Sequence, residues 1–154
     1  MSNLTAFLDT IAHAEIGPVM LAASDNGYNI IAGSVPGKMR LFHDYSDHPR
    51  KMVKVGNIYS TAAGRYQILS RIFDFYRAEL HLHDFGPASQ DDIAIQLIRE
   101  CRALSDIEQG LFDSAIHKCR SRWASLPGAG YGQPEKRIDE LRRVFTETGG
   151  VIRQ

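Results

Sequence analysis

The sequence predicts an α+β domain made of one helix, a small β region and a mostly helical body. Apolar residues recur at helical spacing near the N-terminus and again beyond residue 60, whereas glycines and prolines interrupt short apolar runs over residues 18–59. Of the 154 residues, 44% are hydrophobic and 23% charged, which fits one globular domain and excludes a disordered chain. We therefore expect a single domain over residues 1–154, with an irregular β region at about 18–59 and a helical body at about 60–150.

The first helix is expected to begin after Ser2 or Asn3, because either side chain can cap a helix N-terminus. Gly17 and Pro18 end its pattern. Its apolar stripe is formed by Leu4, Phe7, Leu8 and Ile11. The β region that follows is expected to be a small sheet with long loops, because its apolar runs are short and turn-forming residues separate them.

The helical body is expected to start at Ser60 and to contain four or five helices. Pro87 opens one of them, and Ser105 with Glu108 has the spacing of a capping box for a short helical turn. Pro134 is expected to open the last helix. The apolar stripes of this region run over residues 68–80, 93–104, 112–123 and 138–145.

The balance of charge limits the classes of partner. Lys+Arg and Asp+Glu each number 18, so the formal net charge is zero, and neither nucleic acid nor a membrane surface is expected as a general partner. The charge is uneven, because residues 111–154 carry eight basic and five acidic side chains. Lys118, Arg120 and Arg122 in this segment are candidates for a salt-sensitive attraction to anionic polymers. No stretch approaches the about 20 apolar residues of a membrane-spanning helix, so no stable membrane insertion is expected.

Two features concern the compartment of the protein. Cys101 and Cys119 are too few for a disulfide scaffold and lack the spacing of a metal site, so we expect buried free thiols. The first 20 residues contain no Lys or Arg, so no signal peptide is expected and the chain is expected to be made in the cytoplasm. Work outside the inner membrane would then need another route of export.

Glu15 is the first candidate catalytic residue. It follows Ile11 by four residues and Leu8 by seven, which places a carboxyl group on the apolar stripe at the C-terminal end of the first helix. Burial and the negative end of the helix dipole both disfavour the charged form, so this carboxyl could stay protonated near neutral pH and act as a general acid. The alternative is a side chain that turns to solvent at the helix end.

The segment from Ser60 to Gln67, with sequence STAAGRYQ, is a candidate ligand loop. Small residues and Gly64 let the backbone approach a ligand closely, while Tyr66 offers a flat apolar face and Gln67 an amide with donors and an acceptor. These groups suit neutral polar rings such as sugars. The alternative is an ordinary helix start capped by Ser60 or Thr61.

A second candidate ligand loop is the segment from Trp123 to Gln133, with sequence WASLPGAGYGQ. It places two aromatic residues around three glycines, an arrangement that can hold the faces of sugars. Trp123 shares its helical spacing with Ile116 and Cys119, so we expect it in the core. Tyr131 is therefore the better candidate for a ligand contact.

The remaining clusters of chemically reactive side chains match no known metal-site or catalytic motif. Histidines and aspartates gather at residues 43–48 and 81–84, but neither group has the spacing of a zinc site, so no metal or other cofactor is expected. The chain contains no GxSxG, P-loop or GxGxxG motif. The common signatures of α/β-hydrolases, NTPases and dinucleotide-binding proteins are therefore absent.

Five segments occur in an order and spacing that chance would rarely produce. They are AHAE at 12–15, DYSDHPRK at 44–51, STAAGRYQILS at 60–70, FGPASQD at 85–91 and WASLPGAGYGQ at 123–133. Together they resemble the endolysins of lambdoid phages, the lambda-type lysozyme family, and the likeness covers about Ala6 to Gly150. The GRYQ motif is also similar to the substrate loop of bacterial lytic transglycosylases and goose-type lysozymes.

The resemblance implies a lysozyme-like fold, mostly helical with a small antiparallel β region beside a substrate cleft. It implies cleavage of the β-1,4 bond between N-acetylmuramic acid and N-acetylglucosamine in peptidoglycan. The single catalytic glutamate of the family falls on Glu15. The glycan contacts of the family carry over to Ser60, Tyr66, Gln67 and Tyr131.

The chain departs from the family pattern at two places. Residues 16–18 are Ile-Gly-Pro where relatives have Gly-Thr after the catalytic glutamate, and Asn29, a further candidate substrate-binding residue, stands where relatives carry an acid. Glycosidases that use water usually need two carboxylates, about 5 Å apart for retention or about 6.5–9.5 Å apart for inversion. Because Asn29 is neutral, Asp44 or Asp47 would have to supply the second one.

The family therefore implies a lytic transglycosylase with one acid. Protonated Glu15 would donate to the glycosidic oxygen, and the sugar's N-acetyl group would stabilise the oxocarbenium-like centre. Glu15 would then deprotonate the C6 hydroxyl of the muramic acid, which attacks C1 and closes a 1,6-anhydro ring. The alternatives are a hydrolytic muramidase that acts on the same bond and a cell-wall binding module that has lost catalysis.

The resemblance also implies partners and a place of action. The partners are the glycan strands of peptidoglycan and a holin that opens the inner membrane of the host. A phage or prophage lysis enzyme of this kind waits in the host cytoplasm and then reaches the periplasm. We expect it to act as a monomer.

Overall fold

The computed structural model describes residues 2–153, and the chain divides into two compact units. One unit combines Met1–Glu15 with Ala94–Gln154, and the other is Ile16–Ile93. Helix α4 (Pro87–Glu100) contains the second boundary between them. The expectation of a single domain stays a prediction.

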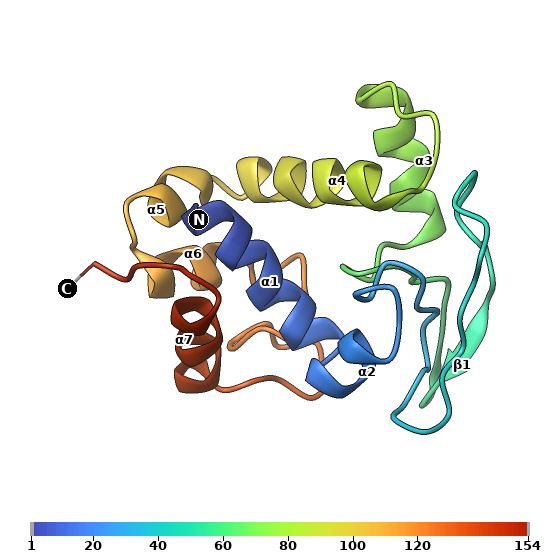
Figure 1. The fold of residues 1–154 in the computed structure, drawn as a ribbon, viewed down its shortest axis with the longest axis horizontal. Coiled ribbons are helices and arrows are strands. Elements are labelled where there is room, and N and C mark those ends of the chain that lie inside the picture. The colour runs from blue at the N-terminus through green and yellow to red at the C-terminus, as the bar shows by residue number, and fades with distance from the viewer. Residues whose placement is uncertain (1, 154) are drawn as a thin grey trace. The chain divides into compact units, whose positions relative to one another are not determined.

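The first unit is helical. Helix α1 packs against α5 and α7, and α5 packs against α6 (Figure 1). The Phe112 ring joins these helices, because its centroid lies 6.0 Å from that of Phe7 and 4.7 Å from that of Phe145. The helices of this unit are α1 (Asn3–Glu15), the C-terminal part of α4, α5 (Leu104–Glu108), α6 (Phe112–Cys119) and α7 (Ile138–Glu147).

Both polar residues at the start of α1 form hydrogen bonds that hold the helix start. The Ser2 hydroxyl accepts a hydrogen bond from the Thr5 amide at 3.2 Å, so Ser2 caps the helix as predicted. The Asn3 side chain accepts from the Val151 amide at 2.9 Å and donates to the Ile107 carbonyl at 3.0 Å. Asn3 therefore ties the start of α1 to α5 and to the C-terminal segment.

The second unit contains the predicted small antiparallel sheet. In its register Val53 pairs with Ser60, Lys54 with Tyr59, and Val55 with Ile58. Single bridges between Ile30 and Leu41, Ile31 and Ala63, and Ala63 and Ile68 connect the surrounding loops. The elements of this unit are α2 (Pro18–Ala22), β1 (Val53–Val55), β2 (Ile58–Ser60), α3 (Ser70–Glu79) and the N-terminal part of α4.

His48 is buried in the aromatic core of the second unit. Its ring centroid lies 4.7 Å from that of Phe85 and 6.0 Å from that of Phe73. Its Nδ1 accepts from the Arg50 amide at 2.9 Å, so its Nε2 carries the proton and donates to the Ile68 carbonyl at 2.8 Å. Burial lowers the pKa of His48, which favours this neutral form.

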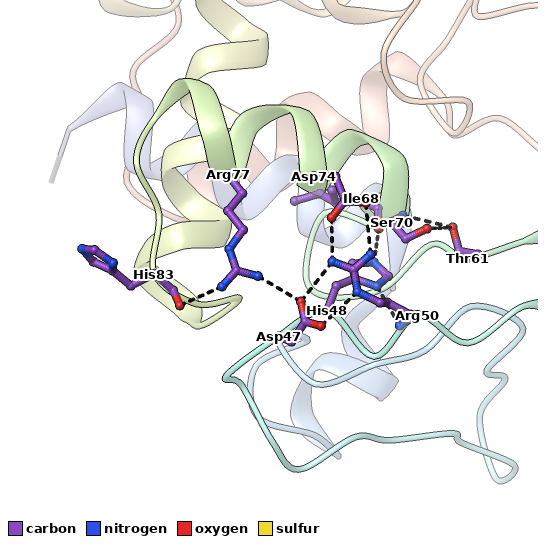
Figure 2. A network of polar contacts seen from close by, with 9 residues as sticks. All are labelled: Asp47, His48, Arg50, Thr61, Ile68, Ser70, Asp74, Arg77 and His83. Carbon is purple, nitrogen blue, oxygen red and sulfur yellow. Dashed lines mark hydrogen bonds and ion pairs between the residues drawn. The ribbon is translucent and has the colours of Figure 1, made fainter.

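A cluster of ion pairs attaches the loop around His48 to α3 (Figure 2). The Arg50 guanidinium lies between two carboxylates, at 2.6 and 3.1 Å from Asp74 and at 2.9 and 3.1 Å from Asp47. Arg77 of α3 donates to Asp47 and to the His83 carbonyl, both at 3.3 Å. Asp47 is therefore part of the framework of this unit.

The helical body begins later than predicted. Ser60 ends β2, and the helix that carries the next apolar stripe starts only at Ser70. Gly64 and Gln67 explain the delay, because their φ angles of 83° and 51° are left-handed and break a helix. Thr61 caps α3 from a distance, since its Oγ1 accepts the Ser70 amide at 3.0 Å.

Three further helix boundaries differ from the predictions. Helix α6 ends at Cys119, so Trp123 lies beyond it, although it is buried as expected. Helix α5 begins at Leu104 after Ala103, so Ser105 is inside the helix and forms no capping box. Helix α7 begins at Ile138 and not at Pro134. None of the described helices combines the length and apolar character needed to span a bilayer.

Gln90 organises the loop around Gly64 from a fully buried position. Its Oε1 accepts the Arg65 amide at 2.9 Å, and its amide nitrogen donates to the carbonyls of Tyr28 at 3.0 Å and Phe85 at 2.8 Å. A Cβ atom on Gly64 would stand only 2.2 Å from the Gln90 Oε1. The loop therefore needs glycine here both for its backbone angle and for space.

Comparison of Gly64→Ala with Gly37→Ala tests this account. The two glycines have nearly equal φ angles of 83° and 82°, but nothing lies within 4 Å of a Cβ on Gly37. We expect Gly37→Ala to lower the free energy of unfolding by about 1–2 kcal/mol through backbone strain alone. Gly64→Ala also disturbs buried hydrogen bonds, so we expect a loss of about 3 kcal/mol or more. Urea denaturation measures both, and equal losses would contradict the role of Gln90.

Candidate active site

Glu15 is the last residue of α1, and only part of its surface remains open to solvent. The neighbouring helix positions Ile11, Ala12 and Ala14 are buried, so the helix carries the carboxyl into an apolar environment. Burial raises the pKa of Glu15 to about 7. The protonated and ionised forms are then both populated near neutral pH, which suits a group that gives and takes a proton.

Ser125 lies next to Glu15 and shifts the pKa of Glu15 in the direction opposite to burial. Its hydroxyl interacts with the carboxyl and lowers the pKa of Glu15, although burial outweighs this effect. The Ser125 Oγ is buried and makes no hydrogen bond within residues 2–153. The Ser125 backbone is held in place, because its carbonyl accepts the Lys136 amide at 2.7 Å. A buried hydroxyl without a hydrogen bond of its own thus lies close enough to the Glu15 carboxyl to lower its pKa.

Tyr131 is exposed on the loop that follows α6, with 56% of its surface open. Its hydroxyl donates to the Ser121 carbonyl at 2.8 Å, which fixes the ring against the start of the loop. The Glu135 carboxylate accepts the amides of Gly128 at 2.9 Å and Gly130 at 3.0 Å. These hydrogen bonds lower the pKa of Glu135, so this acid is part of the loop structure.

Ser60 and Gln67 are both half-buried in the second unit. The Ser60 hydroxyl accepts the Ala62 amide at 3.1 Å, and the Gln67 amide donates to the Gly64 carbonyl at 2.8 Å. Each side chain therefore keeps polar capacity beyond its internal hydrogen bond. Their predicted contacts with a glycan stay predictions.

Tyr66 has a different environment from the one predicted. Only 1% of its surface is exposed, so its ring offers no face to a ligand in this structure. Its hydroxyl donates to Asp91 at 2.6 Å and accepts from Arg65 at 2.9 Å. Tyr28 donates to the same Asp91 oxygen at 2.9 Å, and the Arg65 guanidinium lies 5.5 Å from the centroids of both tyrosine rings. Tyr66 supports the loop from inside.

Asn29 is buried, with 9% of its surface exposed. Its Oδ1 accepts the Asp25 amide at 3.0 Å, and its backbone carbonyl accepts the Phe42 amide at 3.0 Å. The side chain therefore stabilises the turn over residues 25–29. Its proposed role as a substrate-binding residue stays a prediction.

The two candidate second carboxylates also have structural partners. Asp47 is paired with Arg50 and Arg77, and the hydrogen bond from Arg50 lowers its pKa. Asp44 is exposed, and its pKa is lowered by the Ser46 amide, which donates to it at 2.9 Å. Both groups are therefore held in the ionised form.

The remaining candidates are the cysteines and the histidine-rich loops. Both cysteines are free, as predicted, but only Cys119 is buried, whereas Cys101 is half-exposed. The prediction of burial is therefore wrong for Cys101, because the residue lies just beyond the end of α4. Within residues 2–153, no three His, Cys, Asp or Glu side chains are grouped so that they could hold a metal ion.

The structure distributes the predicted site residues over the two units. Glu15 and Tyr131 belong to the first unit, whereas Asn29, Ser60, Tyr66 and Gln67 belong to the second. Ser125 next to Glu15, and Gln90 and Asp91 beneath the loop, were not predicted from the sequence. All three lie inside segments of the family resemblance, which was the only signal that could have indicated them.

Comparisons with known proteins show the family of the chain. The family profile described as Endolysin matches residues 5–152. The endolysin of Escherichia phage lambda is 48% identical over 151 residues, covering 97% of this chain and 92% of the relative. The endolysin of Escherichia phage P2 is 45% identical over 155 residues, covering 97% of this chain and 94% of the relative.

Two solved structures of bacteriophage lambda lysozyme also match this chain. Bacteriophage lambda lysozyme in complex with a chitohexasaccharide matches with a TM-score of 0.91 and 47% identity, covering 99% of this chain and 98% of that one. A second structure of lysozyme from bacteriophage lambda matches with a TM-score of 0.86 and 46% identity over the same shares. The lysozyme-like α+β fold is thereby confirmed. With its buried carboxyl at the end of α1 and its match over nearly the full length, this chain belongs to the endolysin family.

Proposed function

We propose that this endolysin cleaves the β-1,4 bond between N-acetylmuramic acid and N-acetylglucosamine as a lytic transglycosylase, with Glu15 as acid and then base. Degradation of peptidoglycan follows from membership of the endolysin family. The choice of transglycosylase chemistry rests on the environment of Glu15. The observation that carries it is a pKa of about 7 for this carboxyl, next to the buried Ser125 hydroxyl.

The first step uses protonated Glu15. Its proton passes to the glycosidic oxygen, so the C1–O bond breaks and N-acetylglucosamine leaves with a free 4-hydroxyl group. The N-acetyl group of the muramic acid stabilises the positive charge at C1. The Glu15 carboxylate that remains can accept a hydrogen bond from Ser125, whose hydroxyl makes no hydrogen bond among the described residues.

The second step returns Glu15 to its starting form. The carboxylate takes the proton of the C6 hydroxyl of the muramic acid while O6 attacks C1. A 1,6-anhydro ring forms, and Glu15 is protonated again, so no water is consumed. A single group can serve both steps because its pKa lies close to neutral pH.

A hydrolytic muramidase would need a second carboxylate with freedom to act. Asp47 is paired with Arg50 and Arg77, and Asp44 accepts the Ser46 amide. Asn29 is neutral and its side-chain oxygen holds the Asp25 amide. These engagements support the one-acid mechanism over hydrolysis.

The proposal also covers the oligomeric state of the enzyme, its source and the compartment in which it acts. We propose a monomeric enzyme of a phage or prophage that is held in the host cytoplasm and enters the periplasm when a holin opens the inner membrane. This part rests on family membership alone. The chitohexasaccharide bound to lambda lysozyme supports glycan strands as the substrate.

Glu15→Gln tests the catalytic role. The amide keeps the shape of the side chain but cannot donate or accept the proton, so we expect clearing of permeabilised Gram-negative cells to slow by about 100-fold to 10,000-fold. Glu108→Gln is the matched control, because Glu108 also ends a helix but is exposed. Equal clearing by Glu15→Gln and wild type would show that Glu15 is not the acid.

The mass of the released muropeptides separates the two chemistries. Wild-type enzyme is expected to release fragments with 1,6-anhydro ends, which lack the water that hydrolysis adds. Products that carry one extra water would establish a hydrolytic muramidase and contradict the transglycosylase proposal.

Ser125→Ala tests the influence of Ser125 on the acid. Loss of the hydroxyl removes the interaction that lowers the pKa of Glu15, so this pKa should rise. The alkaline limb of the kcat/KM profile should then move to higher pH. Ser121→Ala, in an exposed part of the same loop, should leave the profile unchanged. An alkaline limb that stays in place or moves to lower pH would argue against the contact.

Glu15 should also make stability depend on pH. Its pKa is about 7 in the folded protein and 4.5 without burial, so the folded state binds more protons between these pH values. The free energy of unfolding is therefore highest below pH 4.5, falls as the pH rises, and has lost this contribution above pH 7. Glu15→Gln removes this dependence. The free energy of unfolding of the variant relative to wild type should therefore rise by roughly 3 kcal/mol between these pH values. Urea denaturation at pH 4.5 and pH 8 measures it, and a constant difference would contradict the raised pKa.

A further inference from the structure

The hairpin formed by β1 and β2 presents an unpartnered outer face. Val53 is buried, so its neighbours Met52 and Lys54 point to the opposite side of the strand. Tyr59 pairs with Lys54 across the hairpin and therefore lies on the same side. Met52 is 62% exposed and Tyr59 is 68% exposed. We call Met52, Lys54 and Tyr59, together with the exposed Lys51 that precedes strand β1, the hairpin face.

The hairpin face lies in the most positively charged stretch of the second unit. Between Asp47 and Asp74 the chain has five Lys or Arg residues and no Asp or Glu. Arg50 is neutralised by these two flanking aspartates. Lys51 and Lys54 are exposed, and within residues 2–153 neither side chain makes an ion pair or hydrogen bond. Their charge is available to an anionic partner.

The basic segment near the C-terminus differs in this respect. Lys118 is paired with Asp106 at 2.6 Å, and Arg122 is paired with Glu100 at 3.0 Å. Arg120 donates to the His117 carbonyl at 2.6 Å. The three basic side chains predicted to attract anionic polymers therefore all have partners within the first unit.

The hairpin face also adjoins the loop predicted to bind glycan. Tyr59 is followed by Ser60, which lies on the other side of β2 and begins the segment that continues to Gln67. In peptidoglycan the muramic acid residues carry peptide stems with free carboxylates. A stem of about four residues reaches about 13 Å when extended, which is enough to pass the edge of a two-stranded hairpin.

We propose that the hairpin face binds the acidic peptide stems of peptidoglycan, with Lys51 and Lys54 pairing with stem carboxylates and Tyr59 packing against the peptide. The inference rests on the proposed function, because it assumes that glycan strands bind at the adjacent loop. It adds a contact that a bare sugar chain cannot make. The enzyme then recognises peptide-bearing wall more strongly than peptide-free glycan.

A lipid surface would also attract two lysines, but the apolar side chains are arranged differently from a membrane-binding tip. Val55 and Ile58 lie on the opposite side from Tyr59, and Val55 lies near Gly33, since a Cβ on Gly33 would be 3.6 Å from the Val55 Cγ2. The exposed apolar surface is thus divided between two sides of the hairpin. On the hairpin face, Met52 and Tyr59 accompany two lysines, and this small mixed surface fits an extended acidic peptide better than insertion into a bilayer.

The test compares two variants that lose the same charge. Lys51→Gln/Lys54→Gln removes two positive charges from the hairpin face, and Lys118→Gln/Arg122→Gln removes two from the first unit. Each pair is combined with Glu15→Gln so that binding to intact sacculi is measured without cleavage. We expect the hairpin variant to bind sacculi about threefold to tenfold more weakly at low salt, with little difference at high salt. The control variant should bind like its parent.

Cleavage assays use the same variants with Glu15 restored. Sacculi and glycan strands stripped of peptides by an amidase are the two substrates. The hairpin variant should cleave sacculi more slowly and stripped strands at the rate of the wild type. Tyr59→Ser should weaken binding to sacculi at both low and high salt.

Four outcomes would overturn the proposal. They are unchanged binding of sacculi by the hairpin variant, an equal loss in the control variant, an equal loss on stripped strands, and binding to vesicles of anionic phospholipid that depends on Lys51 and Lys54. Failure of the wild type to cleave stripped strands would instead contradict the proposed function. The binding comparison on sacculi still decides the role of the hairpin face in that case.

Discussion

Burial of the Glu15 carboxyl is the constraint on which the proposed chemistry depends. A carboxyl in water is ionised at neutral pH and cannot protonate a glycosidic oxygen, whereas burial raises the pKa of Glu15 to about 7. The effect requires that α1 hold its last residue in place. The contacts of Phe112 with Phe7 and Phe145 anchor the helix body, and Asn3 anchors its start. The packing of the first unit therefore sets the strength of the acid as well as the fold.

The second unit holds its predicted glycan loop with a buried polar network. Asp91 accepts two tyrosine hydroxyls, and Gln90 satisfies three backbone groups. Such a network is rigid because each buried polar group has a partner, and loss of one partner leaves the others unsatisfied. Tyr66 belongs to this network, so it acts on the loop through Asp91. Ser60 and Gln67 remain half-buried at the surface of the same loop.

Sequence periodicity predicted the elements that have long apolar stripes and missed those that depend on distant contacts. The stripe of α1 and the Pro87 start of α4 are where they were predicted, because helical spacing and proline chemistry are local properties. The residues from Ser60 to Ser70 were predicted as helix from the same periodicity. The residues between the end of β2 at Ser60 and the start of α3 at Ser70 form a loop, because Gly64 must make room for Gln90, which lies 26 residues further along the chain.

In the candidate site, too, residues could be predicted where their environment follows from the local sequence and could not where it depends on distant contacts. Glu15 could be predicted because its place on an apolar stripe is visible in the sequence, and the resemblance assigned it a role. Ser125 could not, because a serine in a glycine-rich loop carries no sign that its hydroxyl will lie beside a carboxyl 110 residues away. The burial of Tyr66 was equally invisible, since its spacing in STAAGRYQ is compatible with either side of the loop. These are tertiary properties that only the folded chain reveals.

The position of Asn29 completes the argument for one acid. Its side-chain oxygen accepts the Asp25 amide, a task that an aspartate could perform equally well. An aspartate would, however, place a charge at a site that is only 9% exposed, with the Asp25 carboxylate nearby in the same turn. Asparagine keeps the acceptor and avoids that charge. Because the turn is satisfied by a neutral residue and Asp47 is held by two arginines, Glu15 is the carboxyl whose protonation is free to change near neutral pH.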